Sequence, residues 1–74
     1  MLLSEAAPES KYIISDISCD DEELISFLFS LGCYAGETIS LISKKRSNMS
    51  IGVKDAVYCI DNDLASAVEV EKAS

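Results

Sequence analysis

The sequence predicts a small, mainly β domain: an antiparallel barrel of about five short strands with one α-helix inserted among them. Short β-prone or alternating runs recur along the chain between turn-forming residues. One apolar run with helical spacing, from Leu24 to Leu31, interrupts them. The chain has 74 residues, which is enough for a single domain with a small core.

Ordered structure is expected to begin near Lys11. Residues 1–10 are predicted to be a flexible N-terminal tail, because Pro8 and the small or acidic residues offer no periodic apolar surface to bury. Residues 11–72 would then form the single domain. Tyr12, Ile13 and Ile14 predict a first strand over Lys11–Ser15.

A helix is predicted over Asp21–Leu31. Asp20 can cap its N-terminus, and Glu23 three residues later completes a capping box. Gly32 stands where a helix ends in a left-handed residue, and Gly36 opens the next strand from a turn that is expected to use positive φ. The sector expected to face the core contains Leu24, Phe27, Leu28 and Leu31.

The rest of the chain alternates strands and turns. Lys45 to Ser50 is expected to be a polar loop, Lys54 and Asp55 a tight link, and Asp61 to Ser66 one helical turn capped by Asp61 or Asn62. The remaining strands are expected at Glu37–Lys44, Ile51–Val53, Ala56–Ile60 and Val68–Glu71. Strands this short suit a bent SH3-like barrel, since closing a sheet removes its edges.

Composition excludes several classes of function. The net charge of −7 argues against binding to nucleic acid, which depends on Lys and Arg releasing counterions from phosphates. A hydrophobic fraction of 49% is generous for so small an interior, so some apolar surface is expected to face a partner. The odd number of cysteines, three, fits a reducing cytoplasm, and no segment resembles a signal peptide or a membrane span. We therefore expect a cytoplasmic protein without membrane insertion.

The residues offer little for catalysis or metal binding. The chain has no histidine and no recognisable nucleophile motif, so we expect no enzyme activity and no catalytic residue. Cys33 follows a helix C-terminus, which disfavours a thiolate, and Cys59 is expected to be inert in an apolar strand. Asp61-Asn62-Asp63 begins like a calcium loop, but Lys72 stands where its final glutamate belongs. No metal site and no cofactor are predicted.

The order of several motifs resembles the FeoA family of small accessory proteins of bacterial ferrous-iron uptake. The similarity spans roughly Tyr12 to Glu71, and its most specific part joins the Leu31-Gly32…Gly36 junction to Asp63-Leu64-Ala65 and Val68-Glu69-Val70. The resemblance implies an SH3-like fold, no catalysis, and work beside the membrane GTPase transporter FeoB. The chain departs from the family pattern at Cys33-Tyr34, where an aliphatic residue and a proline are common, and at Ile60, where arginine is common.

Two surfaces are candidates for partner binding. Ile25 and Phe29 lie beside the core-facing sector of the helix. Ile25 fits a place in the core and a place in an interface equally well, whereas Phe29 is the better candidate for an interface anchor. Tyr34, in the adjoining turn, could extend the surface around Phe29. The basic run Lys44-Lys45-Arg46 is either a solvated hairpin tip or a contact for an acidic patch or anionic headgroups.

The leading hypothesis is a cytosolic adaptor that modulates a FeoB-type transporter by protein–protein contact. The alternative is a regulatory or sensor module that resembles the SH3-like C-terminal domain of iron-dependent repressors and acts through self-association or a soluble partner. A third class, a thiol redox protein or metal carrier, would require reactive cysteines. The oligomeric state is open, and a homo-oligomer is one possibility.

Overall fold

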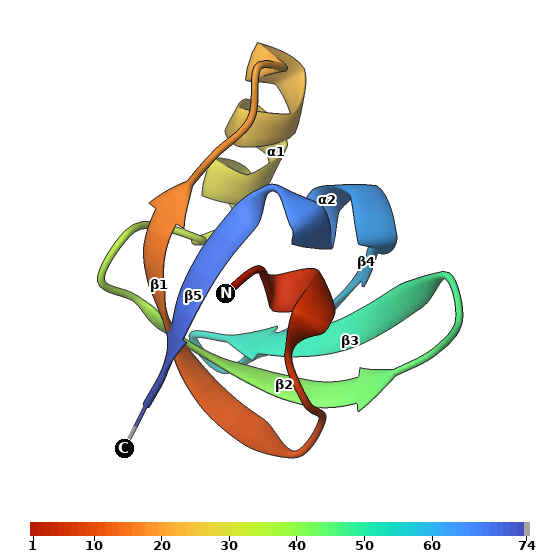
Figure 1. Cartoon of the computed structure of the whole chain (residues 1–74). Helices are drawn as coiled ribbons and strands as arrows, with labels where there is room; N and C mark the ends of the chain where they lie inside the picture. The colour runs from red at the N-terminus through yellow and green to blue at the C-terminus, as the bar shows by residue number, and fades with distance from the viewer. Residues whose placement is uncertain (74) are drawn as a thin grey trace.

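The computed structural model describes residues 1–73, and its strands form one strongly curved antiparallel sheet (Figure 1). The strand order is β4-β3-β2-β1-β5, and α1 occupies the connection between β1 and β2. This confirms the predicted mainly β, SH3-like architecture with one inserted helix. The elements are η1 (Leu3–Glu5), a 3₁₀ turn, followed by β1 (Ser10–Ile17), α1 (Glu22–Leu31), β2 (Thr38–Lys44), β3 (Asn48–Val53), β4 (Ala56–Asp61), α2 (Asn62–Ser66) and β5 (Val68–Lys72).

Several strands are longer than predicted because alternate residues continue to bury side chains beyond the apolar runs. β3 begins at Asn48 rather than Ile51, since Met49 also points into the core. β1 extends from Ser10 to Ile17 and pairs with both β2 and β5. The fully buried side chains on the sheet include Ile14, Ile39, Leu41, Met49, Ile51, Val68 and Val70.

The start of α1 differs by one residue from the prediction. The carboxylate of Asp21, not Asp20, caps the helix by accepting a hydrogen bond from the backbone N–H of Glu23 at 2.9 Å. The predicted glycine turns are confirmed: φ is +95° at Gly32 and +94° at Gly36. In α2, the carboxylate of Asp61 caps the helix by accepting from the N–H of Leu64, as one of the two expected caps.

The expected burial of Phe27 is wrong. Helix α1 stands at one end of the barrel and projects away from it (Figure 1). As a result, the barrel covers only a narrow stripe of the helix: Leu28 is fully buried, Leu24 and Leu31 are half-buried, and Phe27 is 47% exposed. A longer contact with the sheet would have been needed to bury the full predicted sector.

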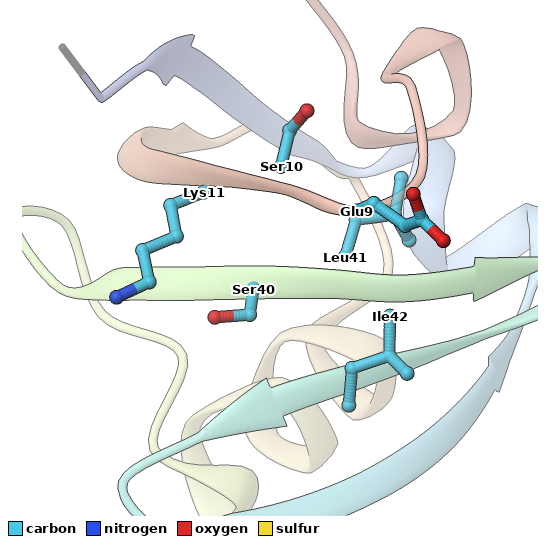
Figure 2. Close-up of a pocket in the computed structure, with 6 residues that line it drawn as sticks. All are labelled: Glu9, Ser10, Lys11, Ser40, Leu41 and Ile42. Atoms are coloured by element: carbon cyan, nitrogen blue, oxygen red, sulfur yellow. The ribbon is translucent and has the colours of Figure 1, made fainter.

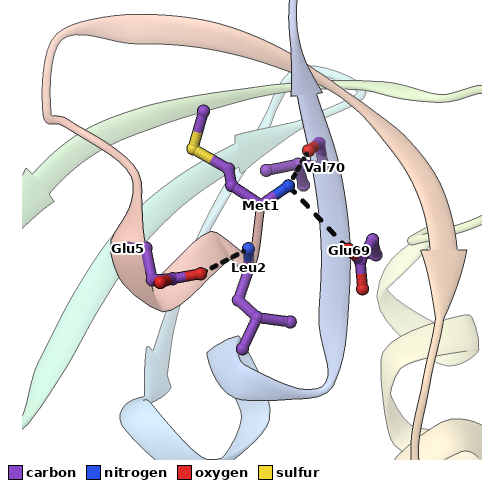
Figure 3. Close-up of polar contacts among 5 residues, drawn as sticks. All are labelled: Met1, Leu2, Glu5, Glu69 and Val70. Carbon is purple, nitrogen blue, oxygen red and sulfur yellow. Dashed lines mark hydrogen bonds and ion pairs between the residues drawn. The ribbon is translucent and has the colours of Figure 1, made fainter.

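The N-terminal residues pack on the barrel, which corrects the expectation that residues 1–10 have nothing to bury. The N–H of Val70 donates to the carbonyl of Met1 at 2.7 Å. The terminal ammonium of Met1 donates to the Val70 carbonyl at 3.1 Å (Figure 3). The ammonium also lies 3.8 Å from a carboxylate oxygen of Glu69. Leu3 and Ala6 are buried in the core. The single turn of η1 places both side chains inward. A turn of three residues is too short to show a repeating apolar pattern in the sequence, so this burial is not predicted.

This packing predicts a stability effect for a residue in the apparent tail. Leu3→Ala should lower the free energy of unfolding by about 3 kcal/mol, because it removes a fully buried side chain and leaves a cavity. Urea unfolding measures this value. Pro8→Ala, at an exposed position of the same segment, is the control and should change stability little. A wild-type value for Leu3→Ala would show that the segment does not contribute to the core.

Gly36 supplies a second stability test. Gly36→Val should destabilise the fold by about 1–3 kcal/mol, because a β-branched residue is strained at positive φ. An added Cβ would meet nothing within 4 Å, so the strain comes from the backbone alone. Gly52→Ala is the control, since its Cβ would make ordinary contacts and its φ is not positive. An unchanged melting temperature for Gly36→Val would contradict this account of the turn.

Candidate functional site

The candidate site is built on the turn that connects α1 to β2. Gly32 ends the helix in the left-handed conformation, and the N–H of Cys33 donates back to the carbonyl of Leu28 at 3.0 Å. Gly36 then donates its N–H to the carbonyl of Ile14 in β1 at 2.7 Å. These bonds fix both ends of the turn, so the position of Tyr34 between them is set by backbone geometry.

An exposed aromatic pair lies at this turn. The rings of Phe29 and Tyr34 stack with their centroids 5.1 Å apart and their planes 21° apart. Phe29 is 40% exposed and Tyr34 is 45% exposed. The ammonium of Lys54 lies 5.6 Å from the centre of the Tyr34 ring, and 3.5 Å from a carboxylate oxygen of Glu37. We call Phe29, Tyr34 and Lys54 the aromatic patch.

Ile25 is half-buried on α1, four residues before Phe29. Residues four apart on a helix lie on the same side, so Ile25 borders the aromatic patch. The sequence left open whether Ile25 belongs to the core or to an interface. Because the side chain is half-buried, it is covered on one side and borders the exposed surface on the other.

The three residues of the basic run Lys44-Lys45-Arg46 have different surroundings in the structure. The ammonium of Lys44 donates to the carbonyls of Ser4 at 2.6 Å and Ala6 at 3.3 Å, so this residue ties the N-terminal segment to β2. Lys45 and Arg46 are exposed between β2 and β3. Lys54 follows the opposite end of β3, so these two residues lie about 20 Å from the aromatic patch, at ~3.3 Å per strand residue.

Lys54 is the member of the patch that the sequence does not reveal. It was expected only as part of the tight link with Asp55, and the structure confirms that turn: φ is +47° at Lys54 and +67° at Asp55. Its contact with Tyr34 depends on the β3–β4 turn lying beside the α1–β2 turn. No local sequence signal carries that information, because it follows from the order of strands in the sheet.

The three cysteines occupy different environments. Cys33 is buried, and burial raises the pKa of its thiol by desolvating the thiolate. Cys59 lies on β4 as expected, but it is exposed, so burial does not support its expected inertness. Cys19 is half-buried, and its sulfur accepts a hydrogen bond from the N–H of Asp21 at 3.3 Å.

Neither a metal centre nor a membrane span is found within residues 1–73. No three His, Cys, Asp or Glu side chains of this part of the chain gather closely enough to hold a metal ion. None of its helices has the length and apolar character needed to cross a bilayer.

A shallow hollow of about 400 Å³ lies between the start of β1 and the middle of β2 (Figure 2). Its lining comes from Glu9, Ser10, Lys11, Ser40, Leu41 and Ile42. None of these residues was singled out from the sequence. One acid, one base, two serines and two aliphatic side chains show no convergence on a particular ligand, so the aromatic patch remains the stronger candidate.

Comparison with known proteins gives the same fold. No curated protein matches the chain in sequence. A solved structure of an iron uptake regulatory protein, FeoA, is 29% identical with a TM-score of 0.87, and the match covers 99% of this chain and 96% of that one. The zinc-complexed FeoA of Stenotrophomonas maltophilia, described as a prokaryotic SH3-domain protein, is 18% identical with a TM-score of 0.85 over 96% of this chain and 89% of that one.

A manganese-dependent transcriptional repressor also matches, with 15% identity and a TM-score of 0.91 over 99% of this chain, but only 41% of the repressor is covered. That likeness shows a shared fold within a longer protein. The model of the FeoA domain family, in contrast, matches residues 1–72, nearly the whole chain. The chain therefore belongs to the FeoA family of non-catalytic accessory proteins associated with ferrous-iron transport.

Proposed function

We propose that this protein is a cytosolic adaptor that binds the cytosolic part of a FeoB-type ferrous-iron transporter through the aromatic patch. The transporter is its partner, and it modulates uptake by contact without chemistry of its own. The observation that carries the proposal is the exposed, stacked pair Phe29–Tyr34 beside Lys54. Family membership supports an association with the ferrous-iron transport system, and the aromatic patch is a surface suited to binding a protein of that system.

The aromatic patch has the properties of a binding hot spot. Large aromatic side chains dominate the energy of protein interfaces, and here two of them are exposed side by side. Stacking already restricts both rings, and the Lys54–Glu37 ion pair at 3.5 Å restricts the ammonium above Tyr34. Little side-chain entropy is then lost on binding, which favours affinity.

Charge indicates the complementary surface on the transporter. The chain carries a net charge of −7, and α1 begins next to a run of exposed acidic side chains: Asp20, Asp21, Glu22 and Glu23. This run lies at the N-terminal end of α1, about 10 Å along the helix from Phe29 at ~1.5 Å per residue. A basic surface on the transporter at that distance from an apolar pocket would complement both features. Lys45 and Arg46 are too far from the patch to share its contact, and we propose that they orient the protein against a separate acidic site or anionic headgroups.

The sensor-module alternative is favoured by one observation, the fold shared with part of a transcriptional repressor. In that case the physiological partner would be a soluble regulator or a second copy of the chain. The two functions differ in what the aromatic patch binds, so a patch variant tested against the transporter separates them.

Phe29→Ala should weaken binding to the detergent-solubilised transporter by about 2 kcal/mol, or about 30-fold in Kd, because it removes one ring of the stacked pair. Calorimetric titration with the transporter in the presence of GTP or GDP measures the affinity. The melting temperature should change little, since 40% of Phe29 is exposed.

Phe27→Ala is the matched control, because it truncates the same residue type at similar exposure on another side of α1. It should leave the affinity unchanged. Equal losses for the two variants would place the contact on the helix as a whole, and no loss for Phe29→Ala would remove the patch from the interface. Wild-type protein that fails to bind the transporter, yet captures a soluble regulator, would favour the sensor module.

Thiol reactivity tests the redox or metal-carrier class. Iodoacetamide at neutral pH should label Cys59 first and Cys33 only after denaturation, because the Cys33 thiol is buried and its pKa is raised. Mass spectrometry of timed samples gives the order, and a urea-denatured sample gives the reference rates. Rapid labelling of Cys33 in the folded protein would contradict its burial and favour thiol chemistry.

A further inference from the structure

The two edge strands of the sheet, β4 and β5, differ in whether another part of the chain covers their outer side. β5 pairs with β1 on one side, and on its other side Leu2 forms a bridge with Glu69. Met1 and Val70 also exchange two hydrogen bonds there, and Figure 3 shows the one that the Met1 ammonium donates. β4 is the other end of the sheet and pairs with β3 alone. Among residues 1–73, β4 and β5 do not pair with each other, so the edge of β4 is not closed by the barrel.

The turn before β4 determines which backbone groups face this edge. Lys54 and Asp55 form a two-residue turn with positive φ, so the flanking pair Val53–Ala56 is a hydrogen-bonded pair. Hydrogen bonding to β3 then alternates along the strand. The backbone groups of Ala56, Tyr58 and Ile60 point to β3, and those of Val57 and Cys59 point outward. Within the described residues, no hydrogen bond occupies the outward N–H and C=O groups of Val57 and Cys59.

The middle of this edge lacks the usual protections against pairing. Between Asp55 and Asp61, which place a charge at each end, the stretch Ala56–Ile60 has no charge, proline or glycine, and the side chain of Val57 is 66% exposed. The opposite edge strand, in contrast, carries Glu69, Glu71 and Lys72 in addition to its N-terminal cover. An uncovered edge with four free hydrogen-bonding groups is complementary to another extended strand.

We propose that β4 pairs antiparallel with β4 of a second copy of this chain about a two-fold axis. The occupant follows from self-complementarity: the free groups of Val57 match those of Cys59 in the second copy, and the reverse pair follows by symmetry. This register is centred on Tyr58, forms four backbone hydrogen bonds, and places Val57 across from Cys59 of the second copy. It extends each five-stranded sheet into a continuous sheet of two copies.

Charge makes this pairing dependent on salt. Each copy carries a net charge of −7, and at the ends of the paired strands Asp55 of one copy lies near Asp61 of the other. Both effects oppose association at low ionic strength and are screened at high ionic strength. Sedimentation equilibrium of the wild-type protein should therefore show a monomer–dimer equilibrium whose dimer fraction rises between 20 mM and 500 mM NaCl. A monomer at every protein and salt concentration would overturn the proposal.

A cross-linking series tests the register. In a hydrogen-bonded antiparallel pair the opposed Cα atoms are ~5.5 Å apart, within disulfide range, whereas diagonal neighbours are ~7–8 Å apart. Val57→Cys should therefore form a disulfide-linked dimer through Cys59 of the second copy under air with copper phenanthroline. Wild type and the double variant Val57→Cys/Cys59→Ser each have one exposed thiol on this strand and should cross-link far more slowly. Equal rates in all three proteins would overturn this register.

A backbone variant tests the hydrogen bonds. Val57→Pro removes an outward N–H that makes no bond to β3, and proline is tolerated on edge strands at such positions. It should weaken dimerisation about tenfold or more, because symmetry removes two hydrogen bonds at once. Val57→Ala keeps the N–H and should dimerise like the wild type. Circular dichroism checks the fold of both.

If Val57→Pro does not fold, the cross-linking series still decides the proposal. A folded Val57→Pro that dimerises as well as wild type overturns it. The proposal is also overturned if the wild type is monomeric and Val57→Pro lowers its affinity for the transporter, since that result would assign the β4 edge to the transporter.

Discussion

The turn between α1 and β2 is the constraint on which the rest of the molecule depends. Its two left-handed glycines allow the chain to leave the helix and enter the sheet within a few residues. The same turn buries Cys33, bonds to β1 through Gly36, and holds Tyr34 against Phe29. Fold and candidate site are therefore not separate features, because the backbone geometry that starts the barrel also positions the exposed rings.

The N-terminal segment plays the corresponding role at the other side of the barrel. A domain of 74 residues buries a limited fraction of its surface, so each additional core residue matters to its stability. Leu3 and Ala6 add to this core, Lys44 holds the segment through two carbonyls, and Met1 covers the edge of β5. A segment without regular periodicity thus completes the sheet and leaves β4 as its one uncovered edge among the described residues.

Local signals predicted most of the fold. The helix and its glycine end, the tight turn at Lys54-Asp55 and the cap at Asp61 depend on residues adjacent in sequence, and each was found. Leu3 was missed because one buried residue in a short turn has no period. Phe27 was misplaced because its burial depends on how far the barrel extends along α1, which is a tertiary property.

The same distinction separates the parts of the site. Phe29 and Tyr34 were both chosen from the sequence, since one lies off the core sector and the other lies in the adjoining turn. Lys54 was not chosen, because strand order alone brings it to Tyr34, and Lys44 was assigned to a basic tip because its carbonyl partners are about 40 residues away. Long-range contacts of this kind leave no trace in local composition.

The aromatic patch and the edge of β4 are joined by the β3–β4 turn, and this has a consequence for binding. Lys54 lies four residues from Tyr58, so in the proposed pairing each patch would be about 14 Å from the two-fold axis along the strand. The two patches of a dimer would then be separated by roughly 25–30 Å. Two equal sites at fixed spacing bind a two-fold or paired target more tightly than one site does, without any new contact. Self-association through β4 would in this way raise the affinity of a surface whose single copy offers only two exposed rings and one ammonium.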